Sequence, residues 1–361
     1  MQTIKAAVCH EFGAPLVIEE VHLRAPEAGE VQVEIKAVAI CHSDISYAMG
    51  GWGGALPAVY GHEAAGRVSA VGAGVSGFVP GDPVVVTLIR ACGHCAPCAT
   101  GRPTGCETPQ DDGNGPLSTL SGGALHQAMA CGAFASSVVV HHSQIVKIPQ
   151  GIDMAAASLL ACGVITGVGA VINAAQLRAG QDVVVIGAGG VGLNAIQGAR
   201  IAGARRIVAV DMTEDKLAAA REFGATDGVL ASEEKPWRSA KAAMGRGADV
   251  VLVTVGAAKA YDLAPRYLAN GGRVIMGGMP HSGHASSYEA ASFAAMGQSM
   301  IGSKMGEAVI RRDIPWMVDL YAQGRLKLDE LISRRWRFDQ INAAIEDTKS
   351  GHARRNVIVF E

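Results

Sequence analysis

The sequence predicts an α/β protein with a β-rich domain and a second domain built on a doubly wound parallel sheet. The chain of 361 residues is longer than one hydrophobic core usually covers, which favours two domains. Glycine is abundant at 46 residues and aromatic residues make up only 5%, a composition typical of α/β chains with many tight strand-to-helix turns. The pattern of apolar residues also changes near residue 160.

Short alternating segments precede this change. Apolar and polar residues alternate in Val31-Gln32-Val33-Glu34-Ile35, and turns such as Gly81-Asp82-Pro83 separate the segments. Such alternation indicates strands with one buried face, as in an antiparallel sheet. The first part of the chain is therefore expected to be β-rich.

Apolar strands alternate with helical segments after residue 160. This alternation predicts βαβ units and hence a parallel sheet. The expected strands cover residues 182–186, 206–210, 249–253 and 273–276, and the expected helices cover 190–202, 214–223 and 259–268. The alternation ends near residue 302, and helices over 314–323 and 338–350 and a last strand over 356–360 are expected to follow.

Charge and the N-terminus narrow the functional classes. The formal net charge is −2 without a basic stripe, which argues against nucleic acid or an anionic membrane as the main partner and favours a small molecule.

Met1 to His10 lacks the apolar core of a signal peptide, so we expect a cytoplasmic protein with reduced thiols. Residues 154–177 carry no charge and could span a bilayer by length, but their small residues and Asn173 favour a buried, bent domain junction.

Four cysteines form one compact pattern. Cys92, Cys95, Cys98 and Cys106 have the spacing Cys-x2-Cys-x2-Cys-x7-Cys. Two-residue gaps let successive sulfurs of one loop converge on a single tetrahedral ion, and thiolates are ligands that zinc selects. In a reducing compartment a zinc site is favoured over a disulfide knot. We therefore expect a closed, structural zinc site.

A second metal pattern lies earlier in the chain. Cys41-His42-Ser43-Asp44 precedes Gly61-His62-Glu63. A thiolate and an imidazole suit zinc, and this pattern suggests an open site rather than a closed one.

A glycine-rich turn follows the expected strand 182–186. It reads Gly187-Ala188-Gly189-Gly190-Val191-Gly192 and opens the helix 190–202. The first glycine permits the tight turn, the second lets the backbone approach a pyrophosphate at the helix N-terminus, and the third allows close helix-to-strand packing. Asp211 ends the next strand nineteen residues after Gly192, where a carboxylate accepts hydrogen bonds from the adenosine ribose and disfavours a 2′-phosphate. The turn therefore predicts a dinucleotide site that prefers NAD over NADP.

These patterns together resemble the zinc-containing alcohol dehydrogenases of the medium-chain dehydrogenase/reductase family, in particular the branch of the liver-type and glutathione-dependent formaldehyde dehydrogenases. The resemblance covers essentially the whole chain. The matching motifs occur in the family's order and are Cys41–Asp44, Gly61-His62-Glu63-Ala64-Ala65-Gly66, Gly81-Asp82, the four cysteines, Cys162-Gly163-Val164-Ile165-Thr166-Gly167 and the glycine-rich turn.

The resemblance implies a GroES-like catalytic domain over residues 1–163 and 302–361 and a Rossmann domain over 164–301, with the active site in the cleft between them. It implies two zinc ions per chain, and the catalytic one would be held by Cys41, His62 and Cys162. The open fourth position would let zinc act as a Lewis acid on the substrate oxygen while hydride moves between the alcohol and NAD. Asp44 should orient His62, and Glu63 is a possible alternate zinc ligand.

Further roles also follow from the resemblance. Ser43 matches the hydroxyl that takes the substrate proton, and Ser46 stands where many members have a histidine, so the relay beyond Ser43 stays open. Positions matching the cofactor site, in addition to the glycine-rich turn and Asp211, are His42 and Arg355 at the pyrophosphate, Lys216 near the ribose, and Val255, Met276 and Gly278. The expected substrate pocket contains Trp52, Leu88 and Met300.

The apolar character of these pocket residues favours a primary, medium-sized or aromatic alcohol. A polyol or amino-alcohol dehydrogenase is the second reading, although its sorbitol-type members carry Glu where this chain has Cys162. The same motifs also fit an alcohol:acceptor oxidoreductase with tightly held NAD, or a catalytically silent protein that binds NAD and zinc. We expect a homodimer or homotetramer, and the particular alcohol or aldehyde stays open.

Overall fold

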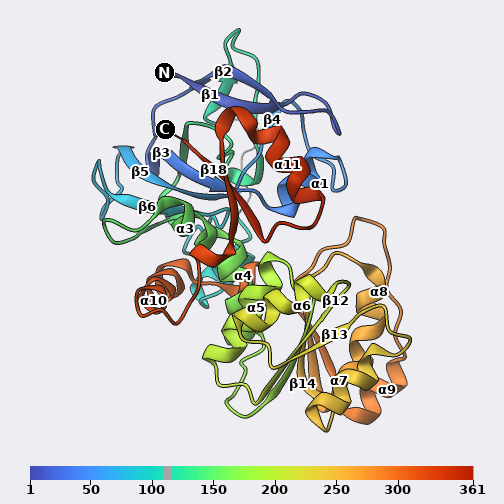
Figure 1. The fold of residues 1–361 in the computed structure, drawn as a ribbon. Coiled ribbons are helices and arrows are strands. Elements are labelled where there is room, and N and C mark those ends of the chain that lie inside the picture. The colour runs from blue at the N-terminus through green and yellow to red at the C-terminus, as the bar shows by residue number, and fades with distance from the viewer. Residues whose placement is uncertain (109–114, 361) are drawn as a thin grey trace. The chain divides into compact units, whose positions relative to one another are not determined.

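The computed structural model describes residues 1–108 and 115–360, which fold into two compact units. The first unit consists of Met1–Cys162, Val309–Gly324 and Leu328–Glu361, and the second of Gly163–Ala308 and Arg325–Lys327 (Figure 1). The units change at Cys162 and Ala308, whereas the sequence placed the domain boundaries after residues 163 and 301. Those predicted boundaries stay a prediction.

The first unit is built on two sheets whose strand pairs are antiparallel except for β4 with β8 and β17 with β18. In spatial order, the smaller sheet contains β7 (Leu117–Thr119), β2 (Val17–Leu23), β1 (Gln2–Cys9), β4 (Ala58–Val59) and β8 (His126–Gln127). The larger contains β10 (Ile145–Lys147), β6 (Pro83–Val86), β5 (Glu63–Val71), β3 (Glu30–Ala39), β18 (Arg355–Val359) and β17 (Ile332–Arg337), with β9 (Ser137–His141) also paired to β3.

Three strands of the larger sheet bring distant chain segments together. β3 alternates between buried and partly exposed residues, as its sequence predicts, and leads through Ile40 into α1 (His42–Ala48). β5 pairs with β3, and its first residue, Glu63, lies opposite Ala39. On the other side of β3, β18 places Val357 opposite Ala39. The ends of these strands therefore meet at the start of α1.

The described residues of the first unit form few helices, together with several single 3-10 turns. Besides α1, its helices are α2 (Ala96–Ala99), α3 (Met154–Ser158), α10 (Ile310–Ala322) and α11 (Ile341–Lys349). The described 3-10 turns of this unit are η1 (Pro103–Gly105), η3 (Ala128–Ala130), η4 (His142–Gln144), η5 (Leu159–Ala161), η9 (Asp329–Leu331) and η10 (Phe338–Gln340).

The second unit contains one parallel sheet of six strands. In spatial order these are β13 (Asp227–Leu230), β12 (Arg206–Asp211), β11 (Asp182–Ile186), β14 (Ala248–Val253), β15 (Leu268–Met276) and β16 (Ser299–Gly302). The connecting elements are α4 (Gly163–Gly169), the π turn η6 (Ala170–Ala174), α5 (Gly190–Ile201), α6 (Glu214–Phe223), α7 (Pro236–Met244), α8 (Ala258–Leu263), η7 (Ala264–Tyr267), α9 (Ala290–Met296) and η8 (Met305–Glu307). The strand order reverses between β11 and β14, which is where such sheets bind ligands.

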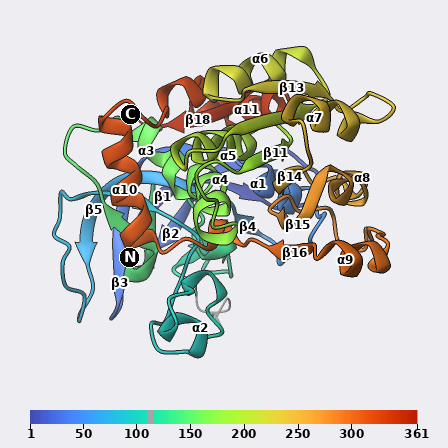
Figure 2. The ribbon, with the colours of Figure 1, turned by 90° about the horizontal axis from the view of Figure 1, so that it is seen from below.

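The central strands of this sheet are buried on both faces because helices cover both. Val183, Val184 and Val185 of β11 are fully buried. α7 and the segment from α8 to η7 cover one face through Ala240 and Tyr261, and α7, α8 and α9 lie on the same side of the sheet (Figures 1 and 2). The continuous apolar strands in the sequence are explained by this two-sided burial.

The expected helix over 259–268 is wrong in its second half. α8 ends at Leu263, Pro265 lies in the 3-10 turn η7, and Leu268 is already the first residue of β15. Ala264 still has helical backbone angles, but Pro265 has no N–H to donate to the carbonyl four residues earlier, so the α-helical hydrogen-bond pattern does not continue past it.

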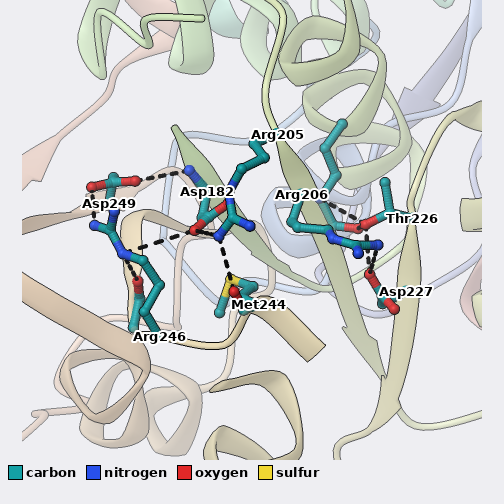
Figure 3. A network of polar contacts seen from close by, with 10 residues as sticks. Asp182, Arg205, Arg206, Thr226, Asp227, Met244, Arg246 and Asp249 are labelled. Carbon is teal, nitrogen blue, oxygen red and sulfur yellow. Dashed lines mark hydrogen bonds and ion pairs between the residues drawn. The ribbon is translucent and has the colours of Figure 1, made fainter. Parts of the chain in front are cut away.

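An ion-pair network lies at the amino-terminal end of the parallel sheet (Figure 3). The carboxylate of Asp182 is buried and lies 2.6 Å from Nη2 of Arg205 and 3.9 Å from Nε of Arg246. The backbone N–H of Asp182 donates to Asp249 at 2.8 Å, which joins β11 to β14. These contacts fix the end of the sheet opposite to the one that carries the glycine-rich turn.

The uncharged segment 154–177 is bent. Within the described ranges 1–108 and 115–360, no single helix is long and apolar enough to cross a membrane. Met154–Ala161 and Gly163–Ala174 meet the length and composition requirement only as a pair, and they are bent by 51°.

Candidate active site and metal centres

One group of potential metal ligands lies in the interior of the first unit. One ligand atom each from Cys41, His62, Glu63 and Cys162 lies within 4.8 Å of the others. Cys41 immediately precedes α1, His62 and Glu63 lie at the start of β5, and Cys162 follows η5. All four are at most 7% exposed. The fold thus assembles this group from three separate chain segments.

Asp44 connects two members of this group. Its Oδ1 lies 2.9 Å from Nδ1 of His62 and accepts the backbone N–H of Gly61 at 2.9 Å, and its Oδ2 accepts the N–H of Cys41 at 3.1 Å. The carboxylate is 2% exposed. Asp44 holds Nδ1 of His62, which leaves the other ring nitrogen for the metal group. Outer-shell carboxylates orient histidine ligands in this way at metal sites.

The donor set fits a zinc ion. Nε2 of His62 is buried and has no hydrogen-bond partner within the described part of the chain, an arrangement that costs free energy unless a ligand fills it. The two thiols form a coupled pair: the hydrogen bond with Cys162 lowers the pKa of Cys41 well below its usual range and raises that of Cys162. Thiolate, imidazole and carboxylate are donors that zinc takes. If Cys41, His62 and Cys162 hold the ion, the fourth position of a tetrahedral site stays open.

Glu63 is a buried carboxylate beside a buried guanidinium. Nη1 of Arg355 lies 3.3 Å from Oε1 of Glu63, and Arg355 is only 6% exposed. Burial raises the pKa of Glu63 to about 7, although Arg355 opposes this increase. The sequence assigned Arg355 to the cofactor pyrophosphate, and that role stays a prediction.

The second metal group is the four-cysteine lobe, residues 92–106. Ligand atoms of Cys92, Cys95, Cys98 and Cys106 lie within 4.8 Å of one another, and all four cysteines are free thiols of intermediate exposure. The Sγ atoms of Cys92 and Cys98 are 4.0 Å apart, and those of Cys95 and Cys106 are 3.9 Å apart. A tetrahedral zinc with Zn–S bonds of about 2.3 Å needs sulfurs roughly 3.8 Å apart. The lobe therefore fits a closed zinc site.

Backbone N–H groups stabilise the thiolate of Cys92 in the lobe. Sγ of Cys92 accepts the N–H of His94 at 3.4 Å and of Cys95 at 3.3 Å. A hydrogen bond with Thr108 and these backbone groups lower the pKa of Cys92 to about 5. This thiol is therefore prepared for metal binding near neutral pH.

The glycine-rich turn of the second unit has the geometry that its sequence predicts. Gly187 has a φ of 98°, and a Cβ there would lie 2.3 Å from Cγ1 of Val255. A Cβ at Gly192 would lie 1.7 Å from the carbonyl oxygen of Gly187. Gly189 is the N-cap of α5, and a Cβ there would meet nothing within 4 Å. Packing thus requires glycine at positions 187 and 192. Gly189 faces open space at a helix N-terminus, which is a suitable place for a pyrophosphate.

Asp211 lies beside this turn. Its Oδ2 accepts the backbone N–H of Ala188 at 2.6 Å, and its Oδ1 accepts that of Met212 at 2.7 Å. The fold thus brings the carboxylate that ends β12 to the turn that follows β11.

The other predicted site residues are distributed over both units. In the first unit, His42 is exposed at the start of α1, Ser43 is half-buried in α1, and Trp52 and Leu88 are half-buried in loops. The Trp52 ring packs edge-on against Tyr47 with centroids 5.0 Å apart. In the second unit, the remaining predicted contacts are half-buried and are Lys216 in α6, Val255 after β14, Met276 and Gly278 at and after the end of β15, and Met300 in β16.

Sequence reasoning missed two supporting contacts. Oγ1 of Thr254 donates to the carbonyls of Gly187 at 2.9 Å and Ile186 at 3.1 Å, which fixes the glycine-rich turn from β14. The pairing of Arg355 with Glu63 was also missed. The available signal was a cation two residues before the apolar run Val357-Ile358-Val359, because a buried cation needs a partner.

Comparison with known proteins agrees with this architecture. The family model described as alcohol dehydrogenase GroES-like domain matches residues 27–150, and that described as zinc-binding dehydrogenase matches residues 190–323. An NDMA-dependent alcohol dehydrogenase of Amycolatopsis methanolica is 34% identical, with 98% of each chain covered. A geraniol dehydrogenase of Castellaniella defragrans is 34% identical over 99% of this chain and 97% of its own.

A solved structure shares both the fold and the full length. The benzyl alcohol dehydrogenase of Acinetobacter calcoaceticus is 29% identical, covers 100% of both chains and superposes with a TM-score of 0.94. The first unit accordingly carries the GroES-like fold and the second the Rossmann fold. The chain belongs to the zinc-containing alcohol dehydrogenases of the medium-chain dehydrogenase/reductase family, enzymes that move hydride between an alcohol and a nicotinamide cofactor.

Proposed function

We propose that this enzyme oxidises a primary, medium-sized or aromatic alcohol with NAD and reduces the corresponding aldehyde in the reverse direction. The observation that carries the proposal is the buried group of Cys41, His62 and Cys162, with the Ser43 helix directly after Cys41. The same group distinguishes this enzyme from polyol dehydrogenases that have Glu at the third position.

Cys41, His62 and Cys162 are proposed to hold the catalytic zinc. When bound, zinc supplies Lewis acidity to the substrate oxygen. Asp44 keeps His62 and the N–H of Cys41 in place, so the donors need little rearrangement. Cys92, Cys95, Cys98 and Cys106 are proposed to hold a second zinc whose role is structural.

Ser43 is proposed to accept the proton that the alcohol loses. It lies two residues after Cys41 in α1 and is half-buried, so its hydroxyl can exchange protons with water. Ser46, one turn later in α1, cannot titrate near neutral pH as a histidine would. The onward path from Ser43 is therefore proposed to run through water.

NAD is proposed as the preferred dinucleotide. Asp211 lies at the glycine-rich turn, where its carboxylate can accept hydrogen bonds from ribose hydroxyls and repel a 2′-phosphate. His42, Lys216, Val255, Met276 and Gly278 are proposed as further cofactor contacts.

The alcohol is proposed to bind against apolar side chains. Trp52, Leu88 and Met300 are large or aliphatic, and two relatives act by name on geraniol and on benzyl alcohol. These names and residues favour an apolar alcohol over a polyol.

The decisive experiment is a panel of alcohols and aldehydes with NAD and NADP, read by the absorbance of the reduced cofactor, on protein whose zinc content is measured. We expect turnover of benzyl-type and terpenoid primary alcohols with NAD and two zinc ions per chain. A preparation that is fully active with one zinc per chain contradicts the assignment.

Replacing Asp211 with glycine tests the cofactor assignment. The variant loses the ribose acceptor and the charge, so kcat/KM with NAD should fall and the ratio for NADP over NAD should rise. A charged hydrogen bond is worth about 1.5–3 kcal/mol, and about 1.4 kcal/mol corresponds to tenfold. An unmodified enzyme that already prefers NADP contradicts this role of Asp211.

A second candidate is an alcohol:acceptor oxidoreductase that retains NAD between turnovers. The relative named NDMA-dependent alcohol dehydrogenase favours this candidate. Gel filtration followed by release of bound nucleotide separates the two, because an exchanging enzyme loses its NAD on the column. The same column tests our proposal that the enzyme is a homodimer or homotetramer. We also propose that it is cytoplasmic and needs neither nucleic acid nor membrane.

A further inference from the structure

Glu63 lies where it could complete the coordination of the catalytic zinc. Its carboxylate belongs to the same group of donors as Cys41, His62 and Cys162, all within 4.8 Å. A four-donor tetrahedral site is closed and structural, whereas catalysis needs one position open for the substrate. If Glu63 bound the ion together with the other three donors, a tetrahedral site would have no position left for the substrate.

No hydrogen bond restrains this carboxylate. In residues 1–108 and 115–360, neither Oε1 nor Oε2 of Glu63 has a hydrogen-bond partner, and the residue is fully buried. The main contact that opposes its charge is the ion pair with Nη1 of Arg355 at 3.3 Å, and His62 opposes it more weakly. The position of Glu63 therefore depends on this guanidinium.

Arg355 is itself fixed to the segment that carries Cys41. Its Nη1 donates to the carbonyl of Ile40 at 3.4 Å, and the N–H of Ile40 donates to the carbonyl of Asn356 at 2.9 Å. Arg355 is the first residue of β18 and is 6% exposed. The backbone of β18 and the guanidinium thus hold one end of the metal group.

We propose that Arg355 is a positioning residue that holds the Glu63 carboxylate away from the catalytic zinc and so preserves the fourth coordination position for the substrate. The inference rests on the proposed zinc site. It adds a role to the pyrophosphate contact assigned to Arg355, and the two roles differ in their consequences. Loss of a cofactor contact weakens NAD binding only, whereas release of Glu63 closes the metal to other ligands.

Imidazole is a suitable probe because its neutral nitrogen is a zinc ligand. Its binding to the zinc-loaded enzyme without NAD is measured by calorimetry, together with zinc content and NAD affinity. We expect Arg355→Gln to keep two zinc ions but to bind imidazole at least about tenfold more weakly, the lower end of the effect of losing an outer-shell partner. The double variant Glu63→Ala/Arg355→Gln should regain imidazole affinity to within about threefold of the parent, a bound well inside that tenfold loss.

The matched control is Arg335→Gln on the neighbouring strand β17. Arg335 pairs with Asp153 at 2.8 Å and is half-exposed, so this variant should bind imidazole like the parent. If Arg355→Gln does not fold, Arg355→Lys carries the test: it keeps the charge and should retain imidazole affinity, and a tenfold loss there would overturn the role of the charge.

Parent-like imidazole binding by Arg355→Gln, with weaker NAD binding alone, overturns the inference and leaves Arg355 as a cofactor contact. Only one zinc per active parent chain would instead overturn the proposed zinc site itself. The two failures are thus distinguishable.

Discussion

The two cysteine groups of this enzyme are assembled in opposite ways. The four-cysteine lobe takes all its donors from residues 92–106, so its geometry depends on one loop. The buried group takes its donors from residues 41, 62–63 and 162, which β3, β5 and η5 bring together. A site made by one loop can form wherever that loop folds, whereas the buried site exists only when the whole first unit is folded.

Their surroundings differ as well. Thiolates of the lobe accept backbone N–H groups, such as that of Cys95 at 3.3 Å, and lie partly exposed. The buried group has carboxylates around it: Asp44 orients two donors, and Glu63 is opposed by Arg355. Uniform thiolates with backbone support fit a structural ion, and mixed donors with titratable neighbours fit a catalytic one.

The largest expected effect comes from removing a thiolate of the buried group. Cys41→Ala should lower the zinc content from two ions per chain to one and abolish turnover, because no other described thiol can replace this donor. The protein should still fold and bind NAD, since the glycine-rich turn and Asp211 lie in the other unit. Metal analysis, steady-state kinetics and NAD titration check the three outcomes.

Cys9→Ala is the control for this variant. Cys9 is also a buried thiol, with its Sγ donating to the carbonyl of Glu11 at 3.3 Å, but it belongs to neither metal group. It should retain both zinc ions and turnover. Equal zinc contents in Cys41→Ala and Cys9→Ala would contradict the assignment of Cys41 as a zinc donor, because Cys41 would then behave like an ordinary buried thiol.

A hydroxyl beside the buried group provides the next largest effect. Ser43→Ala should lower kcat by at least about a hundredfold, because positioned proton transfer contributes roughly 10²–10⁴-fold. Ser43→Thr keeps a hydroxyl and should keep activity. If Ser43→Ala, with zinc and NAD bound, turns over alcohol at the parent rate, the proton leaves by a different path.

Asp44 distinguishes the support of the two groups. Asp44→Asn removes the charge that holds His62, so zinc at the buried group should be lost to a chelator about 10–100-fold more readily, while the zinc of the lobe stays. Asp82→Asn is the control, because Asp82 also accepts a backbone N–H, from Val79 at 2.7 Å, and pairs with Lys147. Release of both zinc ions at parent rates from Asp44→Asn would mean that the ligands are positioned without it.

Local patterns predicted the parallel sheet better than its edges. The expected strand 182–186 and helix 214–223 coincide with β11 and α6, because the strand is buried along its whole length and Thr213 and Gly224 cap the helix. The short strand β13 was not predicted. It begins with Asp227 and Gly228, and Val229 is its one buried residue, so its position depends on pairing with β12.

The two metal groups show the same limit. Spacing alone predicted the lobe, since its donors are neighbours in the sequence. Cys162 was assigned to the buried group by resemblance, because an isolated cysteine in an Ala- and Gly-rich segment carries no local signal. The contact of Arg355 with Glu63 depends on the register of β18 against β3, which no local pattern encodes.

The smallest expected effect on turnover comes from the lobe. Cys95→Ser should remove the second zinc and lower the melting temperature by several degrees, since about 1 kcal/mol corresponds to roughly 2–4 °C in domains of 150–250 residues. At a temperature where the variant stays folded, its kcat per buried zinc should remain close to that of the parent, because the lobe contributes no donor to the buried group.

His94→Ala is the matched control, because His94 lies in the lobe and its Nδ1 contacts the carbonyl of Cys92 at 3.0 Å, yet it is no member of either donor group. It should keep both zinc ions and a melting temperature near that of the parent. Calorimetric unfolding and metal analysis of the two variants decide the matter. If Cys95→Ser loses turnover as completely as Cys41→Ala while still folded, the lobe acts on catalysis directly, and burial and donor type do not separate structural from catalytic zinc in this enzyme.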